Sequence, residues 1–455
     1  MLPQHNIFFK YCIFSAYYLL IQILGGIILE IYTVKSGDTL YNIAQRYRIP
    51  ENTIAQYNML SDPSRLAVGQ DLVIPTTDKA YTVSSGESLY SIALQNNVTL
   101  DALLAANPYL SPPYTIYPNQ IIRIPYSTEE KKVISVNGYA YPNISNSVLT
   151  MTLPYLTYLS IFSYRASADG TINEIDDDAL IATAKRYSVA PLMVVTNTVS
   201  EGGFSSDVAS SIFNNEANMN RFIDNIINKA LTKGYYGIDI DFEYLYQSDR
   251  DNYNSFLSTL SRRTKENNLE LSTAVAPKLS DQQIGLLYEA HDYAYHGRTV
   301  DFVTIMTYEW GYLYGPPMAV SPYTEVKKVI SYAVTEIPPR KVFMGMSNYG
   351  YDWTLPYVSG RPARILTVNQ AVNLAIDVGA EIQFNESSQA PFFEYNDTSG
   401  AKHIVWFENA RSIAARLSLV NDFDLGGVSY WNINSFFPQN WIVLDNMFTI
   451  RKLNL

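Results

Sequence analysis

This sequence predicts an α/β fold: a closed (β/α)₈ barrel of the TIM type with an α+β insertion between its seventh and eighth strands, preceded by two small βααβ domains. The first supporting observation is a repeat, because residues 32–44 recur almost unchanged at residues 81–93. The second is the alternation of apolar strand-like runs with amphipathic helical stretches from residue 133 onward. The third is the gap between the last two of these runs, which is too long for one helix.

The chain opens with a hydrophobic leader, residues 1–29. Its apolar run at residues 11–29 is long enough for the core of a signal peptide or for an uncleaved membrane anchor. A second interpretation is that translation starts at Leu29, because Gly25 and Gly26 are residues that a ribosome-binding sequence would encode. An intact-mass measurement separates the two, and membrane association is expected only if the leader is a real anchor.

Two short repeats follow, at residues 30–76 and 79–126. Each opens with an alternating strand and a Ser-Gly turn before a helix, in the segments YTVKSGDTLYNIA (32–44) and YTVSSGESLYSIA (81–93). Each continues through a helical stretch to Asn58 or Asn107 and closes with a strand that ends in Ile-Pro. The predicted order in each repeat is therefore strand, helix, helix, strand.

The opening motif, the asparagine and the Ile-Pro strand together resemble the LysM domain. This resemblance implies binding of glycans that contain N-acetylglucosamine, as in peptidoglycan or chitin. The turn and helix start of each repeat carry exposed backbone groups and are the expected binding positions. These positions are Gly37, Asp38, Thr39 and Leu40 in the first repeat, and Gly86, Glu87, Ser88 and Leu89 in the second. A role as a spacer alone is the alternative.

Residues 133–455 form the predicted barrel. Its eight strands are predicted at residues 134–141, 156–164, 191–197, 237–244, 269–277, 302–310, 342–350 and 427–433. An open doubly wound sheet is the alternative, but the sequence has no glycine-rich phosphate loop to favour it. The insertion spans about residues 355–410 and contains three strand-like runs with a turn at 397–400, so we expect it to form one wall of a cleft.

Composition and charge exclude several classes of function. The net charge of −11 would repel nucleic acid, so no nucleic-acid partner is expected. The single cysteine, Cys12, lies in the leader, which excludes disulfides and cysteine catalysis in the rest of the chain. The four histidines form no ligand pair, so we predict no metal and no cofactor. The 37 tyrosines suit the flat faces and hydroxyl edges of sugars.

The fourth predicted strand carries the candidate catalytic acids. Asp239, Asp241 and Glu243 are spaced by two, which places their carboxylates on one face while the apolar residues between them face the helices. Carboxylates that crowd together inside a barrel raise the pKa of at least one member, and a general acid needs such a raised pKa. A solvated edge strand or a calcium site is the alternative. Edge strands rarely carry such apolar alternates, however, and calcium loops use a glycine turn.

This strand resembles that of glycoside hydrolase family 18, which carries the motif D-G-x-D-x-D-x-E where this chain has Y-G-I-D-I-D-F-E at 236–243. The departure, Tyr236 in place of the first aspartate, puts in doubt the innermost member of the proton-sharing stack. Residues 306–309 look like the sixth-strand motif M-x-Y-D with Glu309 for the aspartate, and Trp431 falls where the eighth-strand tryptophan lies under the sugar. The resemblance covers about residues 133–450.

The family resemblance implies retaining, substrate-assisted hydrolysis without a protein nucleophile. Glu243 would protonate the glycosidic oxygen while the acetamido carbonyl of the sugar attacks its own anomeric carbon. Asp241 would hold the acetamido N–H, Asp239 would share a proton with it, and Tyr308 would donate to the acetamido oxygen. Glu243 would then activate water.

Three further residues are candidates for binding the substrate: Trp431, Glu309 and Asn197. For Trp431 the alternative is an ordinary core position. For Glu309 and Asn197 a structural role remains equally open.

The whole arrangement looks most like the spore cortex-lytic N-acetylglucosaminidases of endospore-forming bacteria. This resemblance implies a peptidoglycan or cortex-fragment substrate, a role in germination, and a monomer located in the cell wall, the spore coat and cortex, or outside the cell. The alternatives are a chitinase or an endoglycosidase on other N-acetylglucosamine glycans, and a non-catalytic lectin. Such lectins usually lack the terminal glutamate, whereas Glu243 is present.

Overall fold

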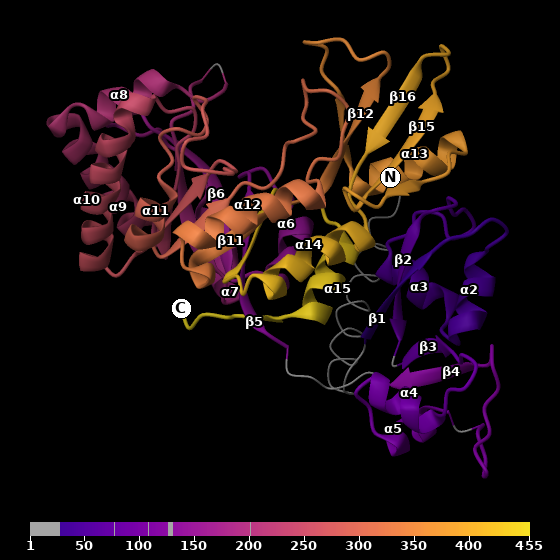
Figure 1. The fold of residues 1–455 in the computed structure, drawn as a ribbon. Helices are drawn as coiled ribbons and strands as arrows, with labels where there is room; N and C mark the ends of the chain where they lie inside the picture. The colour runs from indigo at the N-terminus through magenta and orange to yellow at the C-terminus, as the bar shows by residue number, and fades with distance from the viewer. Residues whose placement is uncertain (1–27, 77, 108, 126–130, 201) are drawn as a thin grey trace, which may run out of the picture. The chain divides into compact units, whose positions relative to one another are not determined.

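The computed structural model describes residues 28–455 except 77, 108, 126–130 and 201 (Figure 1). The chain divides into two compact units, Met1–Lys131 and Lys132–Leu455. Almost all of the predicted leader lies outside the described residues, and the first strand begins at Ile28, within the last two residues assigned to it. No helix in the described part of the chain combines the length and the hydropathy that a membrane span requires.

The first unit contains two repeats with the predicted order of elements. In the first repeat, β1 (Ile28–Thr33) pairs antiparallel with β2 (Asp71–Thr76), and α2 (Leu40–Tyr47) and α3 (Glu51–Tyr57) lie between them in the chain. In the second, β3 (Asp78–Thr82) pairs with β4 (Ile121–Pro125) around α4 (Leu89–Gln95) and α5 (Leu100–Ala106).

A buried asparagine joins the second helix of each repeat to its closing strand. The Asn58 side chain donates to the Val73 carbonyl and accepts from the Val73 N–H, at 2.8 and 2.7 Å. Asn107 makes the same pair of hydrogen bonds with Arg123, at 2.5 and 2.7 Å. Because each core is small, these hydrogen bonds add to the packing of Ile54 or Leu103 in fixing the helix on the sheet.

The second unit is a closed parallel barrel. Among the described residues, its eight strands follow in the order β5 (Val133–Ala140), β6 (Tyr158–Arg165), β7 (Ala190–Thr196), β8 (Gly237–Asp241), β9 (Glu270–Val275), β10 (Phe302–Ile305), β11 (Val342–Ser347) and β17 (Gly427–Trp431). Pairing of β17 with β5 closes the barrel, and the short β18 (Thr449–Ile450) adds to β5. The predicted fold class is confirmed, with each strand close to its expected position.

Helices surround this barrel, as Figure 1 shows for the second unit. They are α6 (Asn146–Thr152), α7 (Asp178–Arg186), α8 (Ser206–Phe213), α9 (Glu216–Lys233), α10 (Arg250–Glu266), α11 (Tyr293–Thr299), α12 (Tyr323–Glu336), α14 (Ala410–Asp422) and α15 (Pro438–Met447). Short 3₁₀ turns occur at Leu153–Tyr155, Gln247–Asp249 and Pro339–Lys341.

The insertion begins earlier than the sequence pattern indicated. The predicted strand 342–350 is two strands, since β11 ends at Ser347 and β12 (Tyr349–Thr354) leaves the barrel after it. At the end of β11 the Ser347 hydroxyl contacts the Ser321 hydroxyl and donates to Glu408, so this strand end is held by side chains from two other segments. The insertion continues with β13 (Arg364–Thr367), α13 (Val368–Val378), β14 (Gln383–Asn385), β15 (Ala390–Asn396) and β16 (Lys402–Trp406). Its strand order is β13-β12-β16-β15-β14.

A glycine turn before β8 and an outward-facing phenylalanine after it orient the acids of this strand toward the barrel axis. Helix α9 ends at Gly234, which adopts the left-handed conformation (φ 72°) and turns the chain into the strand. Phe242, just past the strand, packs outside the barrel against Phe213 and Phe222 of the helical layer, with ring centroids 5.8 and 6.0 Å apart. Because alternate residues face opposite sides, this outward packing turns the three carboxylates toward the barrel axis.

Candidate active site

Asp239 is the innermost of the three acids and is fully buried. Its carboxylate accepts from the Tyr139 hydroxyl at 2.6 Å and from the Ser272 hydroxyl at 2.7 Å. Burial raises its pKa, while these two hydrogen bonds act in the opposite direction. Asp239 is therefore a satisfied carboxylate whose donors come from strands on two sides of the barrel.

Asp241 lies one step further toward the mouth and is 4% exposed. Its Oδ1 atom is buried and has no hydrogen-bond partner among the described residues. Burial raises the pKa of Asp241 well above its ordinary value, and the charges of Glu243 and Asp239 add to that rise. An unsatisfied buried oxygen is costly, and this atom has the capacity to accept a hydrogen bond from a donor that enters the site.

Glu243 is only partly exposed, and its backbone is held from two directions. The buried side chain of Asn197, just after β7, accepts from the Glu243 N–H at 3.0 Å and donates to the Glu243 carbonyl at 2.8 Å. His291 accepts from the Ala276 N–H through Nδ1, so its Nε2–H donates to the carbonyl of Phe242 at 2.9 Å. Burial lowers the pKa of His291 to about 4, which keeps this imidazole neutral.

The Glu243 carboxyl titrates far above an ordinary glutamate. Burial and the nearby charge of Glu309 raise its pKa to about 8. Near neutral pH the group is therefore mostly protonated and can donate a proton.

Glu309 and Tyr308 follow β10 and lie beside these acids. Glu309 has a left-handed backbone (φ 67°), and its carboxylate accepts from the hydroxyls of Tyr349 and Tyr351, both on β12. Burial raises the pKa of Tyr308, and the charges of Asp241, Glu243 and Glu309 raise it further. The neutral Tyr308 hydroxyl is thus a donor placed among three carboxyl groups.

Trp431 ends β17 in a group of aromatic rings at the barrel mouth. Its ring centroid lies 4.8 Å from that of Phe162, 5.7 Å from that of Tyr139 and 5.8 Å from that of Tyr141, all in edge-on contact. The residue is partly exposed, so one part of the indole remains free to contact a ligand.

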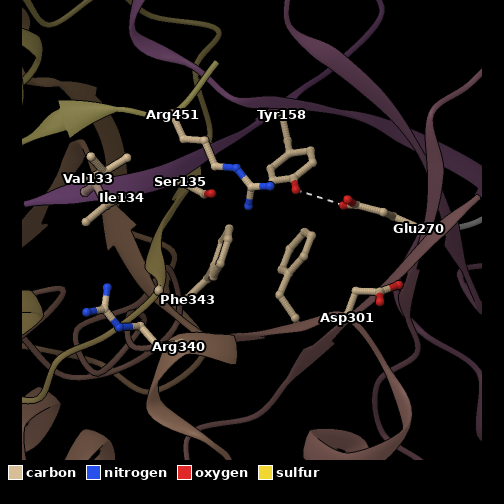
Figure 2. A pocket seen from close by; sticks show the side chains of 11 residues that line it. Val133, Ile134, Ser135, Tyr158, Glu270, Asp301, Arg340, Phe343 and Arg451 are labelled. Carbon is tan, nitrogen blue, oxygen red and sulfur yellow. Dashed lines mark hydrogen bonds between the residues drawn. The ribbon is translucent and has the colours of Figure 1, made fainter. Parts of the chain in front are cut away.

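Tyr236 does not belong to the acid stack. It packs at the opposite end of the barrel with Tyr158 and Phe302, and its hydroxyl interacts with Glu270. A cavity of about 310 Å³ opens at this end, lined by residues at the starts of strands (Figure 2). Figure 2 shows the Tyr158 hydroxyl donating to Glu270, at 2.8 Å. The departure at position 236 thus leaves the inward acids untouched.

In the repeats, the predicted binding residues serve the turn and the helix start. Gly37 and Gly86 both adopt φ +83°, and a Cβ on either would meet no atom within 4 Å, so the turn is open to solvent. Thr39 and Ser88 are N-caps that accept from the backbone N–H three residues later.

The other predicted positions in the repeats face inward or bind the turn itself. Asp38 accepts from a backbone N–H and a tyrosine hydroxyl of its own repeat, and Glu87 makes the same two contacts. Leu40 and Leu89 are buried in the two small cores, at 3% and 7% exposure. These two leucine side chains therefore contribute mainly to the cores, and their role in glycan binding stays a prediction.

Several supporting residues were missed by the sequence analysis. Tyr139 and Ser272 occupy inward positions of their strands, so the same alternation that found the acids could have indicated them. Gly345 gave no signal, yet a Cβ there would come within 2.8 Å of the Tyr308 ring. Within the described ranges, no group of three or more His, Cys, Asp and Glu side chains is arranged to hold a metal ion.

The barrel and its acid stack define a glycoside hydrolase: the chain belongs to glycosyl hydrolases family 18, whose family model matches residues 138–435. The LysM model matches residues 32–75 and 81–125. These domains indicate that the protein binds glycans containing N-acetylglucosamine, such as peptidoglycan, and associates with the cell wall.

Particular relatives share nearly the whole chain. The cortical fragment-lytic enzyme of Bacillus subtilis (strain 168) is 41% identical over 432 residues, which cover 93% of this chain and 99% of that protein. The crystal structure of the spore cortex-lytic enzyme SleL of Bacillus megaterium QM B1551 matches with a TM-score of 0.88 at 37% identity, covering 94% of this chain and 100% of that one. A chitinase from Chromobacterium violaceum, 24% identical with a TM-score of 0.64 over 69% of this chain and 98% of its own, shows the fold alone.

Proposed function

We propose that this protein hydrolyses N-acetylglucosaminyl bonds of spore-cortex peptidoglycan, with retention and with the substrate's acetamido group as nucleophile. The observation that carries the proposal is the pairing of a protonated Glu243 with the partnerless buried oxygen of Asp241. A carboxyl group protonated near neutral pH can donate to a glycosidic oxygen. A buried carboxylate oxygen without a donor fits an amide N–H of the sugar.

In the proposed first step, Glu243 gives its proton to the leaving oxygen as the anomeric C–O bond breaks. The acetamido carbonyl oxygen of the same sugar forms the new bond to the anomeric carbon, which gives an oxazolinium ion. Asp241 accepts the acetamido N–H and offsets the positive charge of this ion. Tyr308 donates its hydroxyl to the acetamido oxygen and so holds it in line for attack.

In the second step, the ionised Glu243 takes a proton from water as the water oxygen attacks the anomeric carbon. The bond from that carbon to the acetamido oxygen breaks, which opens the oxazolinium ring and restores the acetamido group. Each of the two attacks inverts the configuration at the anomeric carbon, so the product keeps the configuration of the substrate. Asp239 shares a proton with Asp241, and hydrogen bonds from Tyr139 and Ser272 hold the Asp239 carboxyl in place. Trp431 lies under the sugar ring.

Two predicted substrate-binding residues take other roles in this proposal. Asn197 is completely buried, and both ends of its amide are used by the backbone of Glu243, so it positions the acid instead of touching the sugar. The Glu309 carboxylate is occupied by two tyrosine hydroxyls, and we assign to it the electrostatic support of Glu243.

The cortex substrate is supported by the relatives, because two similar proteins that align over nearly the whole chain carry cortex-lytic names. The LysM units, through Gly37, Thr39, Gly86 and Ser88, would hold the enzyme on the glycan strand. We place the protein, as a monomer, in the cortex or cell wall, with membrane attachment only if residues 1–29 are an anchor.

The test is to incubate purified protein with spore-cortex fragments, intact peptidoglycan and chitin oligomers, and to identify the new reducing sugar. We expect cortex fragments to be cut fastest, with N-acetylglucosamine at the new reducing end. Glu243→Gln should lose nearly all cleavage and keep glycan binding. Preferred cleavage of chitin would identify a chitinase, and a variant that cuts normally would refute the assigned acid.

A further inference from the structure

The cavity at the N-terminal end of the barrel strands lies apart from the acid stack and has a volume of about 310 Å³ (Figure 2). This volume is at the lower end of the range for sites that bind small molecules. Val133, one of its lining residues, is 54% exposed, so a ligand can enter from solvent. We call it the basal cavity, and its polar lining consists of Ser135, Tyr158, Glu270, Asp301, Arg340 and Arg451.

Arg451 supplies a cation that no neighbouring group neutralises by direct contact. Within the described part of the chain, its guanidinium makes no hydrogen bond and no ion pair. Figure 2 shows this guanidinium extending into the cavity beside Tyr158. A guanidinium in this state can hold a carboxylate through two parallel N–H···O bonds.

The backbone that carries this cation is fixed. The preceding strand β18 pairs with β5, and the Arg451 N–H donates to the Ile134 carbonyl at 2.8 Å. The Thr157 hydroxyl donates to the Arg451 carbonyl at 2.7 Å, and Leu453 is buried in the apolar cluster at this end of the barrel. Because the segment is already ordered, binding an anion at Arg451 costs little conformational entropy.

The second arginine of the cavity is already paired. The Arg340 guanidinium contacts both carboxylate oxygens of Asp424, at 2.9 and 2.8 Å. Arg340 therefore adds to the positive potential of its wall, while the unpaired donors belong to Arg451.

Two carboxylates lie across the cavity from Arg451 (Figure 2). Glu270 accepts from the Tyr158 hydroxyl, and Asp301 accepts from the Leu271 N–H, both at 2.8 Å. Burial raises the pKa of Glu270 and the charge of Arg451 acts in the opposite direction, so these two groups lie within electrostatic reach. This acidic wall repels a multiply charged anion such as phosphate and attracts an ammonium group.

Apolar rings lie between the two charged walls. The rings of Phe302 and Phe343 stack with centroids 4.2 Å apart, and the Tyr158 ring lies 5.1 Å from that of Phe302. All three residues line the cavity. The basal cavity thus combines an unpaired cation, an acidic wall and an apolar surface.

We propose that the basal cavity binds a free amino acid with an apolar side chain. Its carboxylate lies on Arg451, its ammonium group faces Glu270 and Asp301, and its side chain packs on Phe302 and Phe343. These three groups leave one carbon atom, so a single small molecule reaches all three surfaces. The N-terminal end of such a barrel supports stability and not catalysis, so binding there should leave kcat on cortex fragments unchanged.

The test is isothermal titration calorimetry of the full-length protein with three compounds of similar shape. L-leucine carries both charges, isocaproate lacks the ammonium group, and isoamylamine lacks the carboxylate. We expect saturable binding of L-leucine, with a Kd at least about tenfold lower than that of either single-charge compound. No saturable binding at millimolar L-leucine, or equal affinity for L-leucine and isocaproate, would overturn the proposal.

Two variants locate the site. Arg451→Gln should weaken L-leucine binding about tenfold or more. Arg262→Gln is the matched control, because this arginine is 62% exposed on α10 and outside the cavity, and it should bind as the wild type does. Without ligand, both variants should melt at the wild-type temperature. Full binding by Arg451→Gln would contradict the assigned site.

Hydrogen exchange gives an independent readout of the same site. An amino acid held by Arg451 ties β18 to the barrel, so L-leucine should slow amide exchange at residues 449–453. Arg262→Gln should show the same slowing. Exchange that stays unchanged while L-leucine binds would place the ligand elsewhere and would refute the basal site.

Discussion

At the N-terminal end of the barrel strands, Glu270 accepts from the Tyr158 hydroxyl and interacts with Tyr236, while at the C-terminal end Asp241 keeps a buried oxygen without a partner. Burial raises the carboxyl pKa at both ends. The difference lies in the donors, because aromatic hydroxyls satisfy the acid at one end and an incoming ligand must do so at the other. We therefore interpret Glu270 as a carboxylate that supports the fold and Asp241 as one that binds the substrate.

The two ends also differ in the charges that surround their carboxyl groups. Burial opposes ionisation of all three acids, the charges of Glu243 and Asp239 add to this effect at Asp241, and the charge of Glu309 adds to it at Glu243. Figure 2 shows Glu270 and Asp301 across a cavity from Arg340 and Arg451, so charges of both signs are present at the other end. The charge of Asp301 raises the pKa of Glu270 there and Arg451 lowers it, whereas, in the described part of the chain, no cation is among the causes that shift the pKa of Asp241 or Glu243.

The largest effect on kcat is expected from removing the carboxylate of Asp241. Asp241→Asn should lower kcat on cortex fragments about 10²- to 10³-fold, because the positive charge of the oxazolinium ion loses its partner. Glu270→Gln makes the same chemical change at the other end and should alter kcat less than about threefold. Steady-state kinetics of the two variants measures the contrast, and similar losses in both would break the comparison between the ends.

A smaller effect on kcat is expected from removing the side chain that holds the backbone of Glu243. Asn197→Ala leaves the backbone N–H and carbonyl of Glu243 without their partner and should lower kcat about tenfold to a hundredfold, with KM little changed. Asn137→Ala is the control, since this buried asparagine exchanges side-chain hydrogen bonds with Ser429 and Ser160 inside the barrel. Thermal melts should show similar destabilisation in both variants. If their kcat losses also match, Asn197 is merely structural.

The smallest effect concerns pH. Glu243 must be protonated to act, so kcat/KM should fall as pH rises through about 8. The negative charge of Glu309 raises the Glu243 pKa, so Glu309→Gln should move this alkaline limb to lower pH, by about one unit. Tyr351→Phe removes a donor that stabilises ionised Glu309 and should move the limb in the same direction by less. A limb that stays in place would remove Glu309 from the electrostatic account.

Sequence patterns within single strands were enough to predict the position of each strand and the direction in which its side chains point. The alternation around Asp241 located the inward acids, and apolar runs located all eight barrel strands. Contacts across the barrel depend on closure and register, which a local pattern does not contain. For this reason the Tyr139 bond to Asp239, the role of Asn197 and the break after Ser347 emerged only from the structure.

The central claim is that burial and the charge of Glu309 keep the carboxyl of Glu243 protonated at neutral pH. The most direct measurement is a pH titration followed by the infrared difference between the wild type and Glu243→Gln. The account predicts a protonated-carboxyl band, absent from the variant, that disappears as pH rises through about 8. A band lost near 4.5, the ordinary value for a glutamate, would contradict it.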